Sequence, residues 1–199
     1  MKTMILTCSR DGRYSSGYVS GLIDSMSSPY FGGWLRMESE SDIARGRSKL
    51  MHKALGQSID SWLWVDDDIA FRKTHFEQIC SVPAEVVGGL YVKRHKGKSV
   101  VYNDILGDEL PEARDVVTVK EIGTGFLRVT RKAIERMDAL GLPKVENEWV
   151  HYFNAGVQDD GTYLSEDYAF CKNAWASGTK VYLHRECKVG HHGAEVFMP

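Results

Sequence analysis

Three consecutive aspartates, Asp66, Asp67 and Asp68, directly follow the apolar segment Trp62–Val65. Adjacent carboxylates repel one another, so a nearby cation or basic side chain must offset their charge. In an extended segment Asp66 and Asp68 point to the same side and Asp67 to the other. Such a pair can hold a divalent metal ion that also bridges phosphate oxygens. The alternative is a solvated acidic turn at the end of a strand.

Two further groups of residues could carry chemistry. Glu166 and Asp167 stand at the expected start of a helix, where the helix dipole favours acidic residues. A carboxylate at that place could also serve as a base beside a cleft. His191 and His192 could bind a metal, because neutral imidazole is a common ligand of transition metals. Adjacent histidines can equally be surface residues.

The four cysteines are widely spaced and form no CxxC pair. This usage indicates free thiols in a reducing compartment, so we expect a cytoplasmic protein. A structural zinc site made by His184, Cys187 and His191, with Cys171 nearby, is an alternative that the loose spacing disfavours.

The elements that must position these residues alternate between strands and helices through the first half of the chain. This order predicts an α/β fold, a sandwich with a mainly parallel central sheet. No repeat, low-complexity tract or linker is visible, so residues 1–199 are expected to form one domain. Strands are expected at 1–8, 31–37, 62–65, 86–92, 116–119, 125–129 and 180–184, and helices at 14–26, 41–55, after 74, and at 131–140 and 166–176.

One long segment, 143–163, shows no clear periodicity, and such a loop in a compact domain is usually functional or mobile. Its aromatic residues Trp149, Tyr152 and Phe153 could stack against a sugar or a base. They could equally be core residues under a loop.

The composition excludes several classes of protein. The chain has 199 residues and a net charge of −2, so it has no general electrostatic footprint for nucleic acid. No apolar run is long enough to span a bilayer, and the N-terminal segment is predicted to be a strand, not a signal peptide. A P-loop, a dinucleotide-binding fingerprint and a GxSxG motif are all absent from the sequence.

Taken in order, the chemical residues belong to a known series of motifs that extends over most of the chain. With this series the chain resembles the GT-A glycosyltransferases, particularly the small single-domain viral and bacterial members related to the family 2 type. The series is far more specific than a lone DxD motif. It consists of Ile43-Ala44-Arg45-Gly46-Arg47, Leu63-Trp64-Val65-Asp66-Asp67-Asp68-Ile69, Val87-Gly88-Gly89-Leu90-Tyr91, Ile122-Gly123-Thr124-Gly125-Phe126-Leu127, Tyr163-Leu164-Ser165-Glu166-Asp167-Tyr168-Ala169-Phe170-Cys171 and Val189-Gly190-His191-His192-Gly193.

The resemblance implies a GT-A (Rossmann-like) αβα sandwich that binds a nucleotide-sugar. It implies that Asp66 and Asp68 carry Mn²⁺ or Mg²⁺ on the diphosphate of the donor. His191 would complete the metal or phosphate contacts, and His192 is the alternative.

The resemblance also implies that Asp167 is the catalytic base of an inverting enzyme, with Glu166 as the alternative. Relatives often have Asn near Gly46 and Arg47, so the chain departs from the pattern there. The remaining predicted nucleotide contacts are the end of the first strand (Thr7, Ser9 and Arg10), the possible phosphate contacts Arg45 and Arg47, the acidic residues Asp66 and Asp67, and the glycines Gly123 and Gly125, which would let the backbone approach a ligand.

We therefore expect a metal-dependent glycosyltransferase that moves a sugar from a nucleoside-diphosphate sugar, with a UDP-sugar favoured, to an acceptor hydroxyl. The acceptor could be a glycan, a lipid, a protein or a modified DNA base. The basic cluster Lys93–Lys98 would suit a polyanion, or it is a solvated loop. One alternative is a nucleotidyltransferase, but the segment Cys8–Arg13 matches the Gly-rich loop of that class poorly. The other alternative is a non-catalytic nucleotide- or glycan-binding module.

Overall fold

The computed structural model describes residues 1–92, 100–193 and 196–198. The basic cluster Lys93–Lys98 therefore lies outside the described residues. The helices are α1 (Ser16–Ser25), α2 (Ile43–Leu55), α3 (Lys73–Ser81), α4 (Arg131–Asp138) and α5 (Glu166–Ala176). None of the helices in the described part of the chain is long and apolar enough to cross a membrane.

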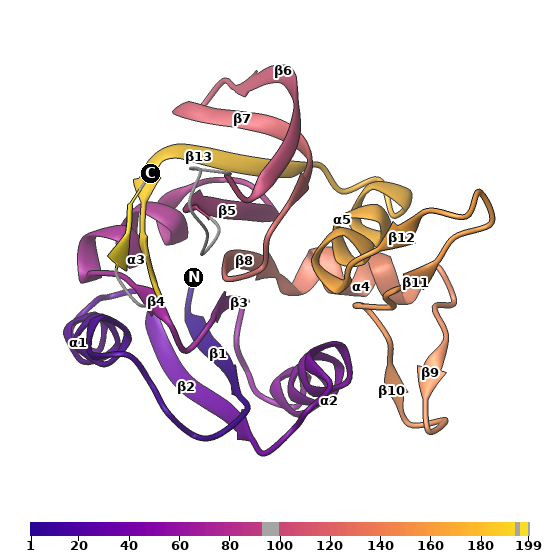
Figure 1. Cartoon of the computed structure of the whole chain (residues 1–199). Helices are drawn as coiled ribbons and strands as arrows, with labels where there is room; N and C mark the ends of the chain where they lie inside the picture. Colours follow the sequence, from indigo (N-terminus) through magenta and orange to yellow (C-terminus); the bar gives the residue numbers. More distant parts are fainter. Residues whose placement is uncertain (93–99, 194–195, 199) are drawn as a thin grey trace.

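An eight-stranded sheet with the order β2-β1-β3-β8-β5-β13-β7-β6 forms the centre of the molecule (Figure 1). Only β8 and β7 are antiparallel to both of their neighbours, so six of the eight strands point the same way. The expected α/β fold with a mainly parallel sheet is confirmed. The strands are β1 (Thr3–Ser9), β2 (Phe31–Glu38), β3 (Ser61–Val65), β5 (Val86–Leu90), β6 (Tyr102–Leu110), β7 (Ala113–Ile122), β8 (Phe126–Thr130) and β13 (Val181–Lys188).

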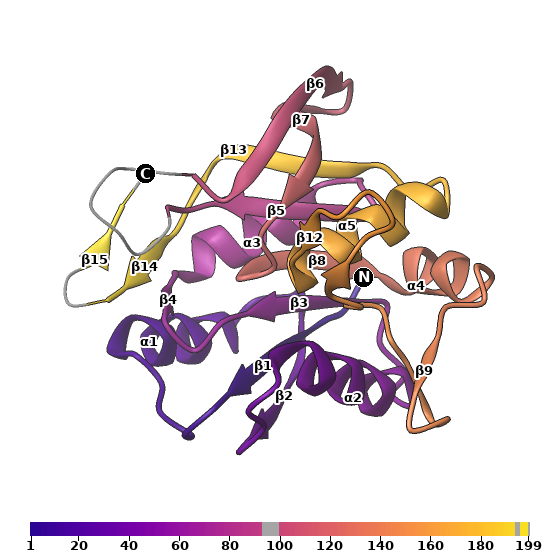
Figure 2. The same ribbon diagram turned by 45° about the vertical axis from the view of Figure 1, so that its right-hand side comes forward.

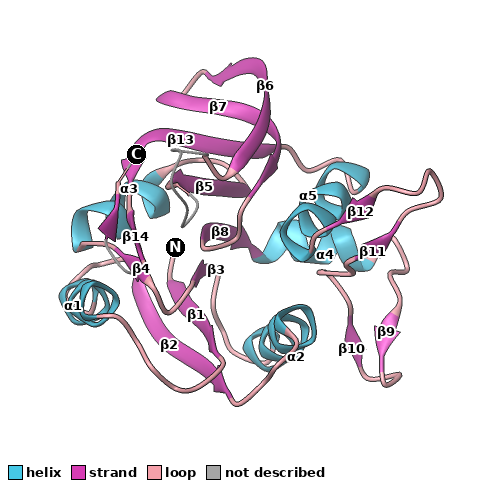
Figure 3. Ribbon diagram, in the orientation of Figure 1, coloured by secondary structure: helices cyan, strands magenta, loops and turns pink. Residues whose placement is uncertain are grey.

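Helices cover both faces of this sheet (Figure 3). Alternate residues of β3 serve the two faces: Trp62 and Trp64 pack with α2, α4 and α5, whereas Leu63 and Val65 pack with α1 and α3. All four side chains are at most 1% exposed. Burial on both faces explains why β3 is apolar throughout, as strands in the middle of an α/β sheet are.

The segment 143–163 contains two short hairpins beside α4 and α5 (Figure 2). One pairs β9 (Lys144–Val145) with β10 (Trp149–Val150), and the other pairs β11 (Gly156–Val157) with β12 (Tyr163–Leu164). Tyr152 and Phe153, which lie between the hairpins, are 1% and 0% exposed. These two residues belong to the core, so the structure contradicts a stacking role for them against a bound sugar or base.

Helix α2 buries Leu50, Met51 and Ala54, and it also buries a charged residue, Arg47. Asp42 caps the helix by accepting a hydrogen bond from the backbone N–H of Arg45. Ile43 is 37% exposed, whereas the side chain of Arg47 is only 3% exposed. Arg47 therefore lies on the buried face of α2 and not on its solvated face.

A second, three-stranded sheet joins β4 (Ile69–Ala70), β14 (Gly190–His192) and β15 (Val196–Phe197). Gly190 pairs with Ala70, and His191 pairs with Ile69. This pairing brings the C-terminal part of the chain to the segment that directly follows the three aspartates.

Candidate active site

The predicted acidic residues gather at one edge of the central sheet. Asp66 follows the carboxyl end of β3, and its backbone N–H donates to the carbonyl of Gly125, which precedes β8. Helix α5 begins at Glu166 and supplies two further carboxylates to the same place. The carboxyl ends of parallel strands are where α/β sheets bind their ligands.

Asp68 and His191 form the first pair of this site. Nε2 of His191 lies 3.4 Å from Oδ1 of Asp68, and the backbone N–H of His192 donates to the carbonyl of Asp68 at 2.7 Å. Nδ1 of His191 lies 2.8 Å from the carbonyl oxygen of Val92. A carbonyl can only accept, so Nδ1 carries the proton, and in the neutral ring the lone pair of Nε2 faces the carboxylate.

Arg47 is the centre of a second group. Its Nη2 atom donates to Asp66 at 2.8 Å, and its Nη1 atom donates to Asp167 at 2.7 Å and to Glu166 at 3.3 Å. Thus Asp66 and Asp68, which were predicted to act as a pair, have different partners. One buried guanidinium faces three carboxylates, so the group as a whole is acidic when all of them are ionised.

A glycine-containing turn supplies the remaining polar contact to Asp167. Thr124 is fully buried, and its hydroxyl donates to Oδ1 of Asp167. Tyr91 fills the space beside this turn, and its hydroxyl accepts a hydrogen bond from the N–H of Gly125 at 2.8 Å. A Cβ atom on Gly125 would lie 2.6 Å from that hydroxyl. The glycine at this position therefore makes room for Tyr91, so Gly125 is not free for close approach of a ligand.

Burial raises the pKa values of three acidic residues in this site, Asp66, Asp67 and Glu166. It raises the pKa of Asp66 despite the opposing effect of Arg47, and it raises the pKa of Glu166, as does the neighbouring Asp167. Burial also raises the pKa of Asp67 to about 6, and the neighbouring carboxylates of Asp68 and Asp66 add to this effect. Burial thus opposes the ionisation of these three carboxyl groups.

Burial alone would lower the pKa of Arg47. The carboxylates of Asp66, Asp167 and Glu166 outweigh that effect and raise the pKa above its ordinary value. Arg47 is therefore a permanent positive charge inside the site.

Several predicted nucleotide contacts have other partners in the structure. The hydroxyl of Thr7 bonds to that of Tyr18 in the core, and the hydroxyl of Ser9, which is 2% exposed, donates to the carbonyl of Arg13. Arg10 is exposed at the end of β1.

The two arginines predicted to meet phosphates are both held by carboxylates. Arg45 makes a two-point contact with Glu40, at 3.1 Å from Nε to Oε2 and 2.6 Å from Nη2 to Oε1. Arg47 is buried among Asp66, Glu166 and Asp167. This geometry argues against a phosphate contact by Arg47, because its donors point to protein carboxylates.

The alternative zinc set is not assembled. Cys171 packs in the core on the α5 side of the sheet, whereas Cys187 packs on the α3 side. Within the described ranges, no group of three or more His, Cys, Asp or Glu residues is placed to hold a metal ion. The pair Asp68 and His191 would therefore need oxygen ligands from a bound molecule to complete a metal site.

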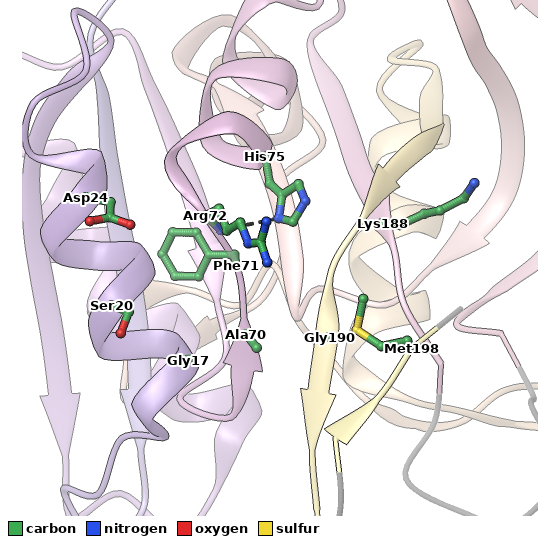
Figure 4. Close-up of a pocket in the computed structure, with 10 residues that line it drawn as sticks. All are labelled: Gly17, Ser20, Asp24, Ala70, Phe71, Arg72, His75, Lys188, Gly190 and Met198. Carbon is green, nitrogen blue, oxygen red and sulfur yellow. Dashed lines mark hydrogen bonds between the residues drawn. The ribbon is translucent and has the colours of Figure 1, made fainter.

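A hollow of about 560 Å³ lies elsewhere, between α1, the start of α3 and β14 (Figure 4). Arg72 and His75 lie beside each other at the start of α3 (Figure 4). No predicted site residue lines this hollow, which is formed by Gly17, Ser20, Asp24, Ala70, Phe71, Arg72, His75, Lys188, Gly190 and Met198.

Sequence reasoning missed three contributors to the site. The motif Gly123-Thr124-Gly125 drew attention for its glycines, but the side chain that reaches Asp167 is that of Thr124. Tyr91 ends a quoted motif without an expected role, although it sets the position of this turn. The carbonyl of Val92, which fixes the ring of His191, leaves no signal in a sequence because every residue has one.

Comparison with solved structures shows the same fold in other proteins. The chain is similar to A197 from STIV, with 17% identity and a TM-score of 0.59 over 97% of this chain and 86% of that chain. It is also similar to GalNAc-T7, solved with UDP, GalNAc and Mn²⁺, with 12% identity and a TM-score of 0.53 over 96% of this chain and 44% of that chain. A third similar structure is S. aureus TarS 1-349, with 12% identity and a TM-score of 0.50 over 94% of this chain and 58% of that chain.

At these identities the likeness shows the fold alone, which is the GT-A arrangement expected from the motifs. This chain spans only about half the length of the GalNAc-T7 and TarS chains. No protein-family model matches the sequence, and no curated protein sequence matches it either.

Proposed function

We propose that the protein is a metal-dependent glycosyltransferase that transfers a sugar from a nucleoside-diphosphate sugar to an acceptor hydroxyl with inversion. The observation that carries this proposal is the placement of Asp68, His191 and Asp167 at one edge of a GT-A sheet. The presence of UDP, GalNAc and Mn²⁺ in the GalNAc-T7 structure supports this donor class and favours a UDP-sugar.

The metal ligands that Asp68 and His191 would provide suit Mn²⁺ or Mg²⁺. A carboxylate oxygen and an imidazole nitrogen 3.4 Å apart can both approach one cation. The hydrogen bond between Nδ1 of His191 and the carbonyl of Val92 holds the ring in the tautomer that binds a metal through Nε2. When bound, a divalent ion would offset the charge that grows on the diphosphate leaving group.

Asp167 is the proposed general base. The hydrogen bonds that Arg47 and Thr124 donate to Asp167 both fall on Oδ1, and the side chain is 26% exposed. Oδ2 would take the proton of the acceptor hydroxyl while that oxygen attacks the anomeric carbon. The bond from this carbon to the diphosphate breaks in the same step, and the electron pair leaves with the nucleoside diphosphate.

Glu166 is the less suitable base. Its carboxylate lies 3.3 Å from Arg47, compared with 2.7 Å for Asp167, and Thr124 bonds only to Asp167. Asp167 is therefore held in one orientation by two side-chain donors, whereas the contact of Glu166 with Arg47 is longer. The Asp167→Asn and Glu166→Gln variants separate the two roles in a turnover assay.

The first test is a thermal-shift panel of nucleoside diphosphates and nucleotide-sugars, each with and without Mn²⁺. A ligand that binds the folded state raises the apparent stability. We expect a Mn²⁺-dependent increase with one base, strongest for UDP, that is abolished in Asp68→Asn. No shift with any nucleotide would contradict the proposal.

A second measurement separates an enzyme from a binding module. Slow hydrolysis of the bound nucleotide-sugar, or transfer to a panel of acceptors, is expected from the wild-type protein and not from Asp167→Asn. Nucleotide binding with no turnover in either protein would favour a non-catalytic module. The panel of acceptors comprises glycans, lipid-linked sugars, peptides and modified DNA.

A further inference from the structure

The contacts of Arg47 differ from those of a ligand-binding arginine. Its two terminal nitrogens contact different carboxylates. Nη2 donates to Asp66, which directly follows β3, and Nη1 donates to Asp167 on α5. Within the described part of the chain, its Nε atom makes no hydrogen bond. The guanidinium is thus a bridge between two elements of the fold and is not a two-point clamp on one anion.

An aromatic stack fixes the place of this guanidinium. The carbon at its centre lies 5.7 Å from the ring centroid of Phe153. Phe153 in turn stacks on Phe170 of α5, with ring centroids 4.9 Å apart and an interplanar angle of 22°. Trp64 of β3 meets the edge of the same ring at 5.4 Å. The bridge and its aromatic support therefore connect the same two elements, β3 and α5.

We propose that Arg47 is a positioning residue of the transfer reaction. It fixes the position of the base Asp167 relative to Asp66, which lies on the side of the sugar donor, and it contacts no part of the donor itself. This inference rests on the proposed function. It extends that function by assigning a separate role to the buried cation. Phe153 acts through Arg47, because its ring supports the guanidinium plane.

The chemistry of arginine explains why lysine cannot replace it here. A guanidinium presents several N–H groups in a rigid plane, whereas an ammonium is a single point of charge. Lysine at position 47 would preserve the positive charge, but it cannot hold Asp66 and Asp167 in the same fixed relation. A displacement of about 1 Å of a reacting group can lower the rate about 100-fold.

The test compares Arg47→Lys with Arg131→Lys. Arg131 is a matched control because it also lies on an aromatic ring, 4.9 Å from Trp62, and donates to the carbonyls of Ile59, Leu55 and Gln57. These contacts lie at the opposite end of β3, where Ser61 pairs with Thr130. Both variants therefore lose a guanidinium that lies over an aromatic ring, but only one loses it at the site.

We expect Arg47→Lys to lower kcat about 100-fold. The dissociation constant of UDP with Mn²⁺ should stay within about threefold of the wild type, because an interaction that only positions the base does not contribute to donor binding. Arg131→Lys should keep both quantities while lowering the thermal stability. A weakened UDP affinity with unchanged kcat in Arg47→Lys would identify Arg47 as a contact of the sugar donor and overturn the proposal. The absence of any effect on kcat and on UDP affinity would also overturn it.

A double-mutant cycle tests the bridge without any assay of activity. The free energies of unfolding are measured for the wild type, Arg47→Met, Asp167→Asn and the double variant. If Arg47 pairs with Asp167 in solution, the double variant loses less stability than the sum of the single losses. The same cycle with Arg47→Lys serves if Arg47→Met does not fold. Additive losses would overturn the bridge.

Failure of the proposed function can be distinguished from failure of the positioning role of Arg47. A wild-type protein that neither binds UDP nor turns over a donor overturns the proposed function and the positioning role together, even when the cycle shows coupling. A wild-type protein that does turn over, with additive losses in the cycle, overturns the role of Arg47 alone.

Discussion

Nε2 of His191 lies 3.4 Å from Oδ1 of Asp68, although the two residues come from distant parts of the sequence. The pairing of β14 with β4 creates this relationship, because it places His191 opposite Ile69, the residue after Asp68. Strand β14 therefore brings a histidine to the segment that directly follows β3. Metal-binding histidines commonly donate one ring N–H to a backbone carbonyl, as Nδ1 of His191 does to Val92.

The first prediction concerns metal affinity. His191→Ala and Asp68→Asn should each weaken Mn²⁺ binding in the presence of UDP by at least about 10-fold, because each removes a ligand. His192→Ala should retain the affinity, since His192 reaches Asp68 through its backbone N–H. Isothermal titration of Mn²⁺ into the protein with UDP measures all three. Loss of affinity in His192→Ala, with none in His191→Ala, would reverse the assignment.

The second prediction concerns the base. Asp167→Asn should lower kcat by about 10²- to 10⁴-fold, the usual contribution of general base catalysis. Its affinity for UDP with Mn²⁺ should remain close to that of the wild type. Asp160→Asn is the control, because Asp160 accepts hydrogen bonds from Thr162 in the exposed turn of the β11–β12 hairpin. Unchanged turnover in Asp167→Asn would remove this residue from the mechanism, and Glu166→Gln would then be tested.

The fold was predictable because its signals are local. Helix α5 was predicted at 166–176, the range the structure shows, since Ser165 and the acidic first turn mark its start and Ser177-Gly178 its end. The edge strand β6 (Tyr102–Leu110) was missed, because its exposed residues, such as Ile105 and Leu106, give no alternation to read. An edge strand pairs with a single neighbour, so its sequence shows little of the alternation of buried and exposed residues that marks a strand.

The site was predictable only in part, because its side-chain partners are set by tertiary contacts. Arg47 shares the buried face of α2 with Ala44 and Met51, at helical spacing. A charge on that face is acceptable only with a partner, and the partner Asp167 lies 120 positions later. The spacing was therefore visible in the sequence, but the compensating carboxylate was not.

The third prediction concerns the turn that supports Thr124. Gly125→Ala should lower the stability by about 1–3 kcal/mol, because the new methyl group overpacks the space filled by Tyr91. Gly56→Ala is the matched control, since its nearest neighbour, the carbonyl oxygen of Lys53, would lie 3.5 Å away. Chemical denaturation of both variants measures the difference. Equal stabilities would contradict the packing described for Tyr91.

The fourth prediction concerns the pH dependence of stability at Glu40. Hydrogen bonds from Arg45 lower the pKa of this carboxyl group to about 2, from an ordinary value of 4.5. A carboxyl group whose pKa is lower in the folded state stabilises the fold above the unfolded value and loses that contribution as the pH falls. The wild type should therefore be more stable than Glu40→Gln at pH 7, and the difference should shrink as the pH falls from about 4.5 towards 2. Urea denaturation of both proteins between pH 7 and pH 3 measures this trend, and a difference that grows towards low pH would contradict the assignment. Glu112→Gln, at an exposed position of the β6–β7 turn, serves as the control for the loss of one carboxylate.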